Sequence, residues 1–212
     1  MVSIVLEQKD LVNNASYWFN TIRIGRGLDR QERETGENLV KYLEDCSNVL
    51  DIGSGRSSYI YEIAQHLPEL KIYIMDKDAK ILKITKEMIE TMHVTDNFEF
   101  IRGDATNIPL RNLDAILMLN VMLYLNIKGV YKSLKSIQTA LRPGGRFLAA
   151  NIGEIDSKLR LYEDYKNTKR FIKIKKIIEK CPELKIKVKQ GPSGHDSSYR
   201  RIWMLKGRKI YK

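Results

Sequence analysis

The chain has 212 residues, 43% of them hydrophobic, and a formal net charge of +11 at pH 7. This length suits one globular domain with one buried core, and no run of residues reaches the roughly 18 apolar positions that a membrane-spanning helix needs. The first ten residues lack the basic start of a secretory signal, so we expect a soluble, cytoplasmic protein with no membrane partner. Cys46 and Cys181 are too few for a disulfide framework or a zinc site, and we expect no metal.

Positive charge is concentrated at the end of the chain. Residues 1–156 carry 19 Lys and Arg against 21 Asp and Glu, whereas residues 157–212 carry 18 against 5. A basic block of this kind suits nucleic acid, an acidic protein or a small anion. A solvated, lysine-rich surface has the same composition, and we rank that simpler interpretation first.

Residues 1–45 precede the first predicted strand. They contain the sequences SYWF and RIGRG, followed by a helix over about 30–45 whose apolar side carries Leu39, Val40, Tyr42 and Leu43. We expect this segment to form a helical lid or brace over the rest of the chain.

From residue 48 onward, short apolar runs alternate with amphipathic stretches, which is typical of a mostly parallel sheet flanked by helices. The nearly continuous apolar character of the runs indicates strands that are covered on both faces. Helices are predicted over about 57–67, 78–92 and 127–141, the first ending before Pro68 and the last before the sequence RPGG. The five predicted strands are NVLDIG, KIYIMD, FEFIRGD, DAILMLN and RFLAANIG.

The alternation ends after the fifth strand. A helix over about 157–180 is predicted next, and then LKIKVKQ and YRRIWMLKGRK, separated by the turn GPSGHDSS, read as a hairpin. We therefore predict an α/β fold, a single domain over 1–212 that comprises a lid (1–45), a ligand-binding core (46–156) and a basic helix with a terminal hairpin (157–212).

The turn after the first strand, in VLDIGSGRSSYIYEIA, carries the strongest local signal. Gly53 and Gly55 allow positive φ and close approach of a ligand to backbone N–H groups. A dinucleotide fingerprint would need a third glycine where Ser58 stands. Asp51 would repel a pyrophosphate and attract an ammonium group, so the turn predicts a ligand that bears a cation.

The sequence resembles the class I S-adenosylmethionine-dependent methyltransferases over about residues 48–152. The resemblance rests on five elements in order: the glycine turn, IYIMD, RGDAT, LDAILMLNVMLYL and LRPGGRFLAAN. It implies a Rossmann-like, mostly parallel seven-stranded sheet with helices on both faces, closed by the C-terminal antiparallel hairpin, and S-adenosyl-L-methionine as the cofactor. The cofactor-binding residues that it implies are Asp51, Gly53, Ser54 and Gly55 in the turn, Asp76 for the ribose hydroxyls with its neighbour Lys77, Asp104 and Ala105 for the adenine edge, and Asn120.

The chain also departs from this family. Ser57 replaces a frequent third glycine, and Asn120 is not followed by the Pro-Pro-aromatic sequence of nucleic-acid amino methyltransferases. Enzymes of the ubiquinone-biosynthesis type commonly have Glu and His where Leu123 and Tyr124 stand. The acids that hold magnesium in catechol-type enzymes are replaced by Asn120 and Asn151.

Direct displacement needs alignment of the acceptor more than it needs a base. Candidates for a general base are Asp51, Tyr124, His195 and a residue of the N-terminal lid. For Tyr124 and His195 the competing interpretations are half-buried packing and a surface position. In the lid, Tyr17 and Trp18 could cover the acceptor or the cofactor, but an aromatic pair that anchors a helix is the preferred interpretation. Arg23 and Arg26 could bind the methionyl carboxylate.

The methyl acceptor is predicted to be a small molecule, and the oligomeric state is left open. The alternatives are RNA or protein held by residues 157–212. From other classes come a nicotinamide-dependent oxidoreductase and a non-catalytic cofactor-binding module.

Overall fold

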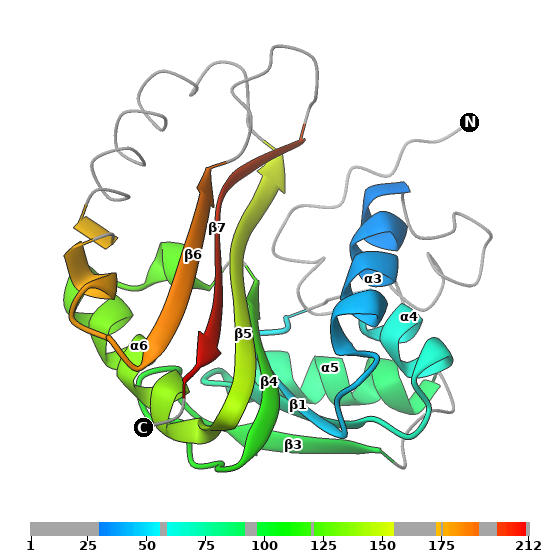
Figure 1. Ribbon diagram of the computed structural model, residues 1–212. Coiled ribbons are helices and arrows are strands. Elements are labelled where there is room, and N and C mark those ends of the chain that lie inside the picture. The colour runs from blue at the N-terminus through cyan, green and yellow to red at the C-terminus, as the bar shows by residue number, and fades with distance from the viewer. Residues whose placement is uncertain are drawn as a thin grey trace.

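The computed structural model of the chain is built on a seven-stranded sheet (Figure 1). The strands are β1 (Asn48–Ile52), β2 (Lys71–Asp76), β3 (Phe98–Arg102), β4 (Leu113–Leu119), β5 (Leu141–Glu154), β6 (Leu184–Gln190) and β7 (Tyr199–Lys209). The structure describes residues 30–55, 59–91, 97–119, 121–154, 173–174, 176–190 and 199–210.

The strand order is β3-β2-β1-β4-β5-β7-β6. All pairs from β3 to β5 are parallel, whereas β7 pairs antiparallel with both β5 and β6. The predicted α/β class, the parallel core and the terminal hairpin are therefore confirmed, and β6 lies at the edge of the sheet. The order also differs from the 3-2-1-4-5-6 arrangement of dinucleotide-binding sheets.

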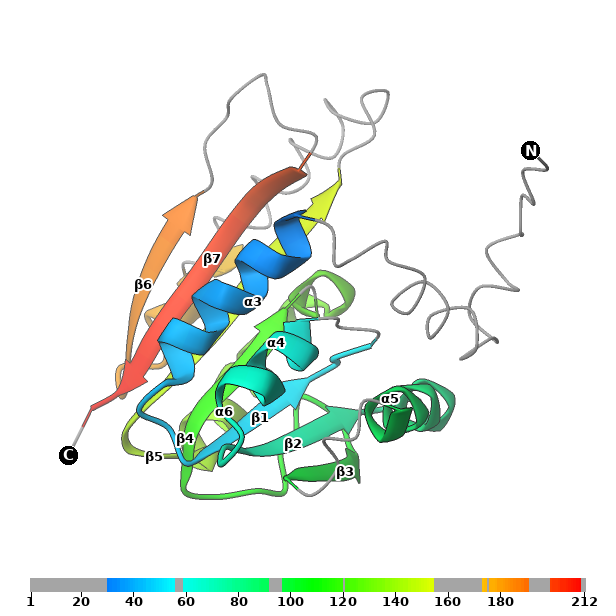
Figure 2. The same ribbon diagram turned by 90° about the vertical axis from the view of Figure 1, so that its right-hand side faces the viewer.

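Helices cover both faces of the sheet (Figure 2). They are α3 (Arg30–Leu43), α4 (Tyr59–His66), α5 (Ala79–Thr91) and α6 (Ile127–Ala140), with a short 3₁₀ helix, η1, at Met122–Tyr124. These bounds agree with the predicted helices to within two residues where the chain is described. Most of the helix predicted over 157–180 lies outside the described residues, of which 173–174 and 176–178 are helical.

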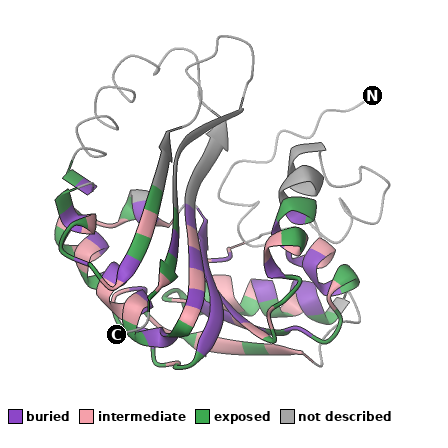
Figure 3. Ribbon diagram, viewed as in Figure 1, coloured by how far each residue is buried: buried purple, intermediate pink, exposed green. Residues whose placement is uncertain are grey.

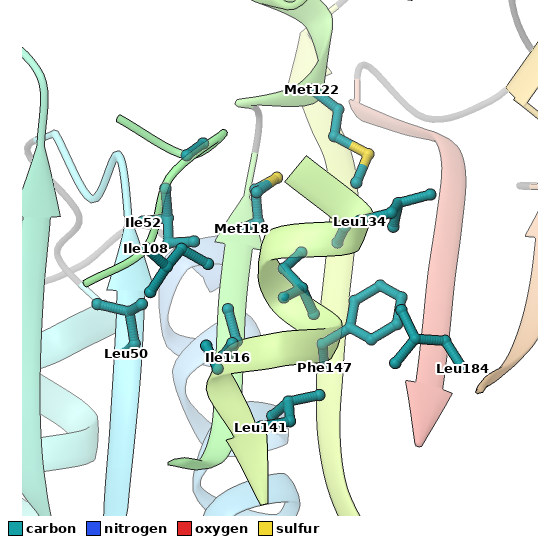
Figure 4. Close-up of a cluster of buried hydrophobic side chains, with 14 of the residues drawn as sticks. Leu50, Ile52, Ile108, Ile116, Met118, Met122, Leu134, Leu141, Phe147 and Leu184 are labelled. Carbon is teal, nitrogen blue, oxygen red and sulfur yellow. The ribbon is translucent and has the colours of Figure 1, made fainter. Parts of the chain in front are cut away.

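Two apolar clusters lie on opposite faces of the sheet, because successive side chains of a strand point to opposite sides. Val49 of β1 packs in the cluster with α3, α4 and α5, whereas its neighbour Leu50 packs in the cluster with α6. Figure 4 shows the second cluster, in which Phe147 of β5 lies close to Leu184 of β6. Every residue of β4 is buried, which confirms that the central strands are covered on both faces (Figure 3).

The described part of the N-terminal segment is a brace on the sheet. At Gly36 of α3 an added β-carbon would lie 2.6 Å from Cβ of Glu62 in α4, so the two helices are in close contact. At the end of α3, Arg146 of β5 donates to Asp45 (Nη1 to Oδ2, 3.0 Å) and stacks on the ring of Tyr42, 4.9 Å from its centroid. Leu39 and Leu43 are buried as predicted. The division of the domain into lid, core and basic end remains a prediction.

The topology creates the place for a ligand. Strand β1 pairs with β2 on one side and β4 on the other, so the connections that follow β1 and β4 diverge at this point. Ligands of open parallel sheets bind at the carboxyl ends of the strands at such a switch point.

Candidate cofactor site

The turn that follows β1 has the conformation that its glycines predict. Gly53 and Gly55 have φ of +64° and +56°, a region that L side chains rarely adopt. The N–H of Gly53 donates to the Met75 carbonyl (2.7 Å), which ties the turn to the tip of β2. An added β-carbon at Gly53 would lie 2.5 Å from Cγ2 of Val121, so any side chain at this position would clash with Val121.

Helix α5 also holds this turn. The hydroxyl of Thr85, which is buried, lies 2.5 Å from the Gly55 carbonyl and 2.9 Å from the Ile81 carbonyl of its own helix. Nothing in the sequence around Thr85 distinguishes it from an ordinary helix residue, and its contact lies 30 positions away in the chain.

Asp51 is the buried acid of the site. Its side chain is 1% exposed, and the hydroxyl of Tyr59, the first residue of α4, lies 2.9 Å from Oδ2 and 3.2 Å from Oδ1. Burial raises the pKa of Asp51 to about 7. The Tyr59 hydrogen bond lowers this pKa, whereas the nearby charge of Asp76 raises it. No cation of the described residues contributes to this balance. A bound cation would therefore stabilise the ionised carboxylate.

Asp114, the other buried acid of the sheet, has a structural environment. Its Oδ2 accepts the backbone N–H groups of Ser47 (2.8 Å) and Asn48 (3.0 Å), and its Oδ1 accepts from Arg142. Burial raises the pKa of Asp114, but these hydrogen bonds outweigh it and the net shift is downward. Asp114 is thus satisfied by the fold, whereas within the described residues the Asp51 carboxylate is held by the Tyr59 hydroxyl alone.

Asp76 ends β2 beside the glycine turn. Its Oδ1 accepts the N–H of Asp78 (2.9 Å), and its carbonyl accepts the N–H of Gly103 (3.0 Å), which links the tips of β2 and β3. Asp78 caps α5, because its Oδ1 accepts the N–H of Lys80 (2.8 Å). The N-terminal cap of α5 is therefore Asp78 and not Asp76.

Asp104 follows β3 and forms a local turn. Its Oδ1 accepts the N–H of Thr106 (2.7 Å), and its carbonyl accepts the N–H of Asn107 (2.9 Å). The Thr106 hydrogen bonds lower the pKa of Asp104, with a smaller effect from the charge of Lys77, which places the exposed Lys77 near this acid. Ala105 is buried in the core. Asp104 is thus an exposed, ionised acid, and its contact with a cofactor remains a prediction.

The segment after β4 lies on the other side of the glycine turn. Val121 contacts Gly53, and η1 buries Met122 while leaving the side chain of Tyr124 82% exposed. The expectation that Tyr124 is half-buried packing is therefore wrong, because η1 places Met122 in the core and Tyr124 at the surface. A catalytic role for Tyr124 remains a prediction.

Several predicted residues lie outside the described residues. These are Asn120, His195, Ser57, Tyr17, Trp18, Arg23 and Arg26, together with the side chain of Asn151.

The described residues bring an acid from each of β1, β2 and the end of β3 to the same edge as the glycine turn. Asp51 suits an ammonium group, Asp76 suits hydroxyl donors, and the glycine at position 53 lets the turn pack closely against Val121. Ser54 is buried in the same turn. These carboxylate acceptors fit S-adenosylmethionine, which carries an ammonium group and the hydroxyl groups of a ribose. Within the described residues there is no cluster of three or more His, Cys, Asp or Glu that could hold a metal ion.

The sheet order, the antiparallel seventh strand and the acid–glycine turn define the fold of class I S-adenosylmethionine-dependent methyltransferases. Residues 49–145 match the family described as methyltransferase domain. A methyltransferase structure from Methanococcus maripaludis, described as S-adenosyl-L-methionine-dependent, superposes with a TM-score of 0.68 at 15% identity and covers 94% of each chain. Over residues 49–145, which are 97 of its 212 residues, the chain is thus similar to a methyltransferase family, and its sheet has the fold of S-adenosyl-L-methionine-dependent methyltransferases.

Curated relatives share part of this core. The ubiquinone/menaquinone biosynthesis C-methyltransferase UbiE of Pseudomonas syringae pv. syringae is 25% identical over 122 residues, which are 56% of this chain and 48% of the relative. The mitochondrial 2-methoxy-6-polyprenyl-1,4-benzoquinol methylase of Danio rerio is 26% identical over 101 residues, 46% of this chain and 31% of the relative. The chain thus spans about half or less of the length of these relatives.

Proposed function

We propose that the protein transfers the methyl group of S-adenosylmethionine to a small-molecule acceptor. The observation that carries the cofactor half of this proposal is the buried carboxylate of Asp51 beside a glycine turn with no room for a side chain. Bound S-adenosylmethionine would supply a methyl group activated by its sulfonium charge, which would pass to the lone pair of an acceptor while S-adenosylhomocysteine leaves with the carbon–sulfur bonding pair.

The residues of the chain bind and orient. Asp51 receives the ammonium group of the methionyl end, Asp76 accepts the ribose hydroxyls, and Asp104 with the backbone of Ala105 binds the adenine edge. Alignment of the acceptor with the methyl carbon and exclusion of water then lower the activation barrier by about 7–11 kcal/mol. The general base, where the acceptor needs one, comes from Tyr124, His195 or the N-terminal segment.

Three features support a small acceptor. The curated relatives are named for small quinone-type molecules, and the exposed ring of Tyr124 offers an aromatic face next to the segment that contacts Gly53. In addition, Asn120 is followed by VMLY instead of the Pro-Pro-aromatic sequence of base-methylating enzymes. A cytoplasmic location remains a prediction; within the described residues no helix has the length and apolar character to span a bilayer.

The test is transfer of tritium from methyl-labelled S-adenosylmethionine into fractionated cell extract. Counts in the low-molecular-weight fraction are expected. Counts that follow RNA or protein would overturn the choice of acceptor. Tight binding of S-adenosylhomocysteine with no transfer to any fraction would instead favour a non-catalytic cofactor-binding module.

A second candidate is an anionic macromolecular acceptor held by residues of β6 and β7. In the hairpin register Lys185 lies opposite Arg208 and Lys187 lies opposite Lys206, and all four side chains are exposed. We call these four residues the basic surface. Lysines on β6 protect a sheet edge from pairing with another chain, but β7 is an interior strand, so edge protection does not account for Lys206 and Arg208.

The basic surface lacks compensation within the hairpin. Like charges directly opposite one another destabilise an antiparallel pair, and none of the four forms an ion pair within 4 Å of another described residue. Partial compensation comes from α3 and the residues after it, because Lys206 lies over the Tyr42 ring, 4.8 Å from its centroid, and the charge of Arg208 acts on Asp45. A polyanion such as RNA would neutralise these charges. Affinity that falls steeply between 50 and 200 mM salt would support this candidate, and a flat response would remove it.

A further inference from the structure

Tyr59 joins two parts of the site that the sequence does not connect. It begins α4, its ring packs against the apolar cluster with α3 and α5, and its hydroxyl reaches back to both carboxylate oxygens of Asp51 at 2.9 and 3.2 Å. A phenylalanine would fill the same apolar space, so packing alone does not require the hydroxyl. The hydroxyl is directed at the one buried carboxylate of the candidate site.

We propose that Tyr59 is a positioning residue of the cofactor site, whose hydroxyl holds the Asp51 carboxylate in the orientation and the ionised form that receive the ammonium group. The inference rests on the proposed function, because the ammonium group belongs to S-adenosylmethionine. No contact between Tyr59 and the cofactor is required, since Tyr59 acts through Asp51.

The surroundings of Asp51 give the hydroxyl its importance. Burial and the charge of Asp76, from β2, both disfavour the ionised carboxylate, and the Tyr59 hydroxyl from α4 favours it. From β4, the residue paired with Asp51 is the apolar Leu117. The resulting pKa of Asp51, about 7, leaves the carboxylate partly protonated at neutral pH. Cofactor affinity should therefore rise as the pH increases through 7, because binding of a cation requires the ionised form.

The experiment compares Tyr59→Phe with the wild type in two measurements. The first is the affinity for S-adenosylhomocysteine by calorimetry from pH 5.5 to 8. Loss of the hydroxyl should move the midpoint of this profile up by about one pH unit and lower the affinity about tenfold at pH 6, while the two proteins converge toward pH 8 and above. The second is the ionisation of Asp51, followed without cofactor by the carbon-13 resonance of its carboxyl group.

Tyr61→Phe is the matched control. Tyr61 lies in the same helix, and its hydroxyl accepts a hydrogen bond from Gln65 on the exposed side. It should leave the pH profile and the carboxyl titration unchanged. A merely structural role for Tyr59 would lower the thermal stability and reduce affinity equally at every pH.

The outcomes separate the two proposals. An unchanged midpoint and an unchanged Asp51 titration in Tyr59→Phe would overturn the role of Tyr59, and so would a gain in affinity, which would mean that the hydroxyl blocks the carboxylate. If the wild type fails to bind S-adenosylhomocysteine at any pH, the proposed function fails, and the carboxyl titration still shows whether Tyr59 controls Asp51.

Discussion

Gly53 and Val121 lie so close together that a β-carbon at position 53 would come within 2.5 Å of Cγ2 of Val121. The contact joins the turn after β1 to the segment after β4, and these two strands are neighbours in the sheet. The backbone of the turn is therefore packed on one side by the side chain of Val121. A glycine at this position is required both by conformation and by space.

Gly53→Ala should reduce the free energy of unfolding by about 2 kcal/mol or more and abolish measurable binding of S-adenosylhomocysteine. Positive φ disfavours alanine, and the new methyl group displaces either Val121 or the turn. Urea denaturation and calorimetry measure the two effects.

Gly55→Ala is the control for the conformational part of this loss. Its φ is also positive, but an added β-carbon would meet nothing closer than the Gly53 carbonyl at 3.9 Å. Its cost should be about 1 kcal/mol. If Gly55→Ala destabilises as much as Gly53→Ala, or if Val121→Ala fails to restore part of the stability of Gly53→Ala, the contact with Val121 has no energetic weight.

Asp76→Ala should weaken binding of S-adenosylhomocysteine by about 1–3 kcal/mol, because the ribose hydroxyls lose a charged acceptor. Asp78→Ala removes the cap of α5 two residues away and should lower stability with little effect on affinity. Equal dissociation constants for the wild type and Asp76→Ala would contradict the ribose assignment.

Asp51→Asn should stabilise the folded protein above neutral pH and weaken cofactor binding. The pKa of Asp51 is raised in the folded protein from 3.8 to about 7, so ionisation opposes folding increasingly as the pH rises from about 4 to 7, and this cost remains above 7. The variant should therefore equal the wild type in stability near pH 4 and exceed it at pH 8 by an amount on the order of 2–4 kcal/mol. Denaturation in urea at both pH values measures the difference.

The same variant should bind S-adenosylhomocysteine weakly and with no midpoint near pH 7, because asparagine offers no charge to the ammonium group. Greater stability of the wild type at pH 8 would show that Asp51 is compensated by a cation beyond the described residues.

Thr85→Val tests whether α5 stabilises the glycine turn. The exchange keeps the buried volume but removes the hydroxyl from the Gly55 carbonyl, which should cost about 1–2 kcal/mol of stability and weaken cofactor binding. Thr139→Val is the control, because Thr139 of α6 bonds only the carbonyl of Lys135 one turn back. Equal losses in the two variants would mean that the bond to the turn contributes nothing beyond a local helix contact.

The sequence predicts the parts of this site that depend on neighbours along the chain. Asp51, Gly53 and Gly55 lie within five residues, so an acid before a glycine turn can be recognised from the sequence alone. Tyr59 and Thr85 were not predicted, because their partners are set by how α4 and α5 pack on the sheet. No local pattern marks a tyrosine or a threonine whose hydroxyl will reach a turn.

The start of β5 shows the same limit in the fold. The sequence RPGG predicts a break before a strand at Arg146, but β5 begins at Leu141. Leu141 already pairs with Leu113, and the register shifts between Leu113 and Ala115, so that the proline and glycines are accommodated inside the strand as an irregularity. Pairing with an existing strand overrides the turn preference of these residues.

Lys187→Glu tests whether the basic surface is retained for a ligand at the expense of stability. The change replaces a like-charge pair with Lys206 by an opposite-charge pair, which should raise the free energy of unfolding by about 0.5–1 kcal/mol while still leaving a charged residue on the edge strand. If the surface binds RNA, the affinity for a 20-nucleotide single strand, measured by fluorescence anisotropy at 50 mM salt, should fall, and its salt dependence should become shallower.

Lys83→Glu on α5 makes the same change in net charge away from the hairpin and breaks an ion pair with Glu87, so it should lower stability slightly and leave RNA binding largely unchanged. Equal effects of the two substitutions on RNA affinity would mean that the basic surface acts only through the net charge of the protein.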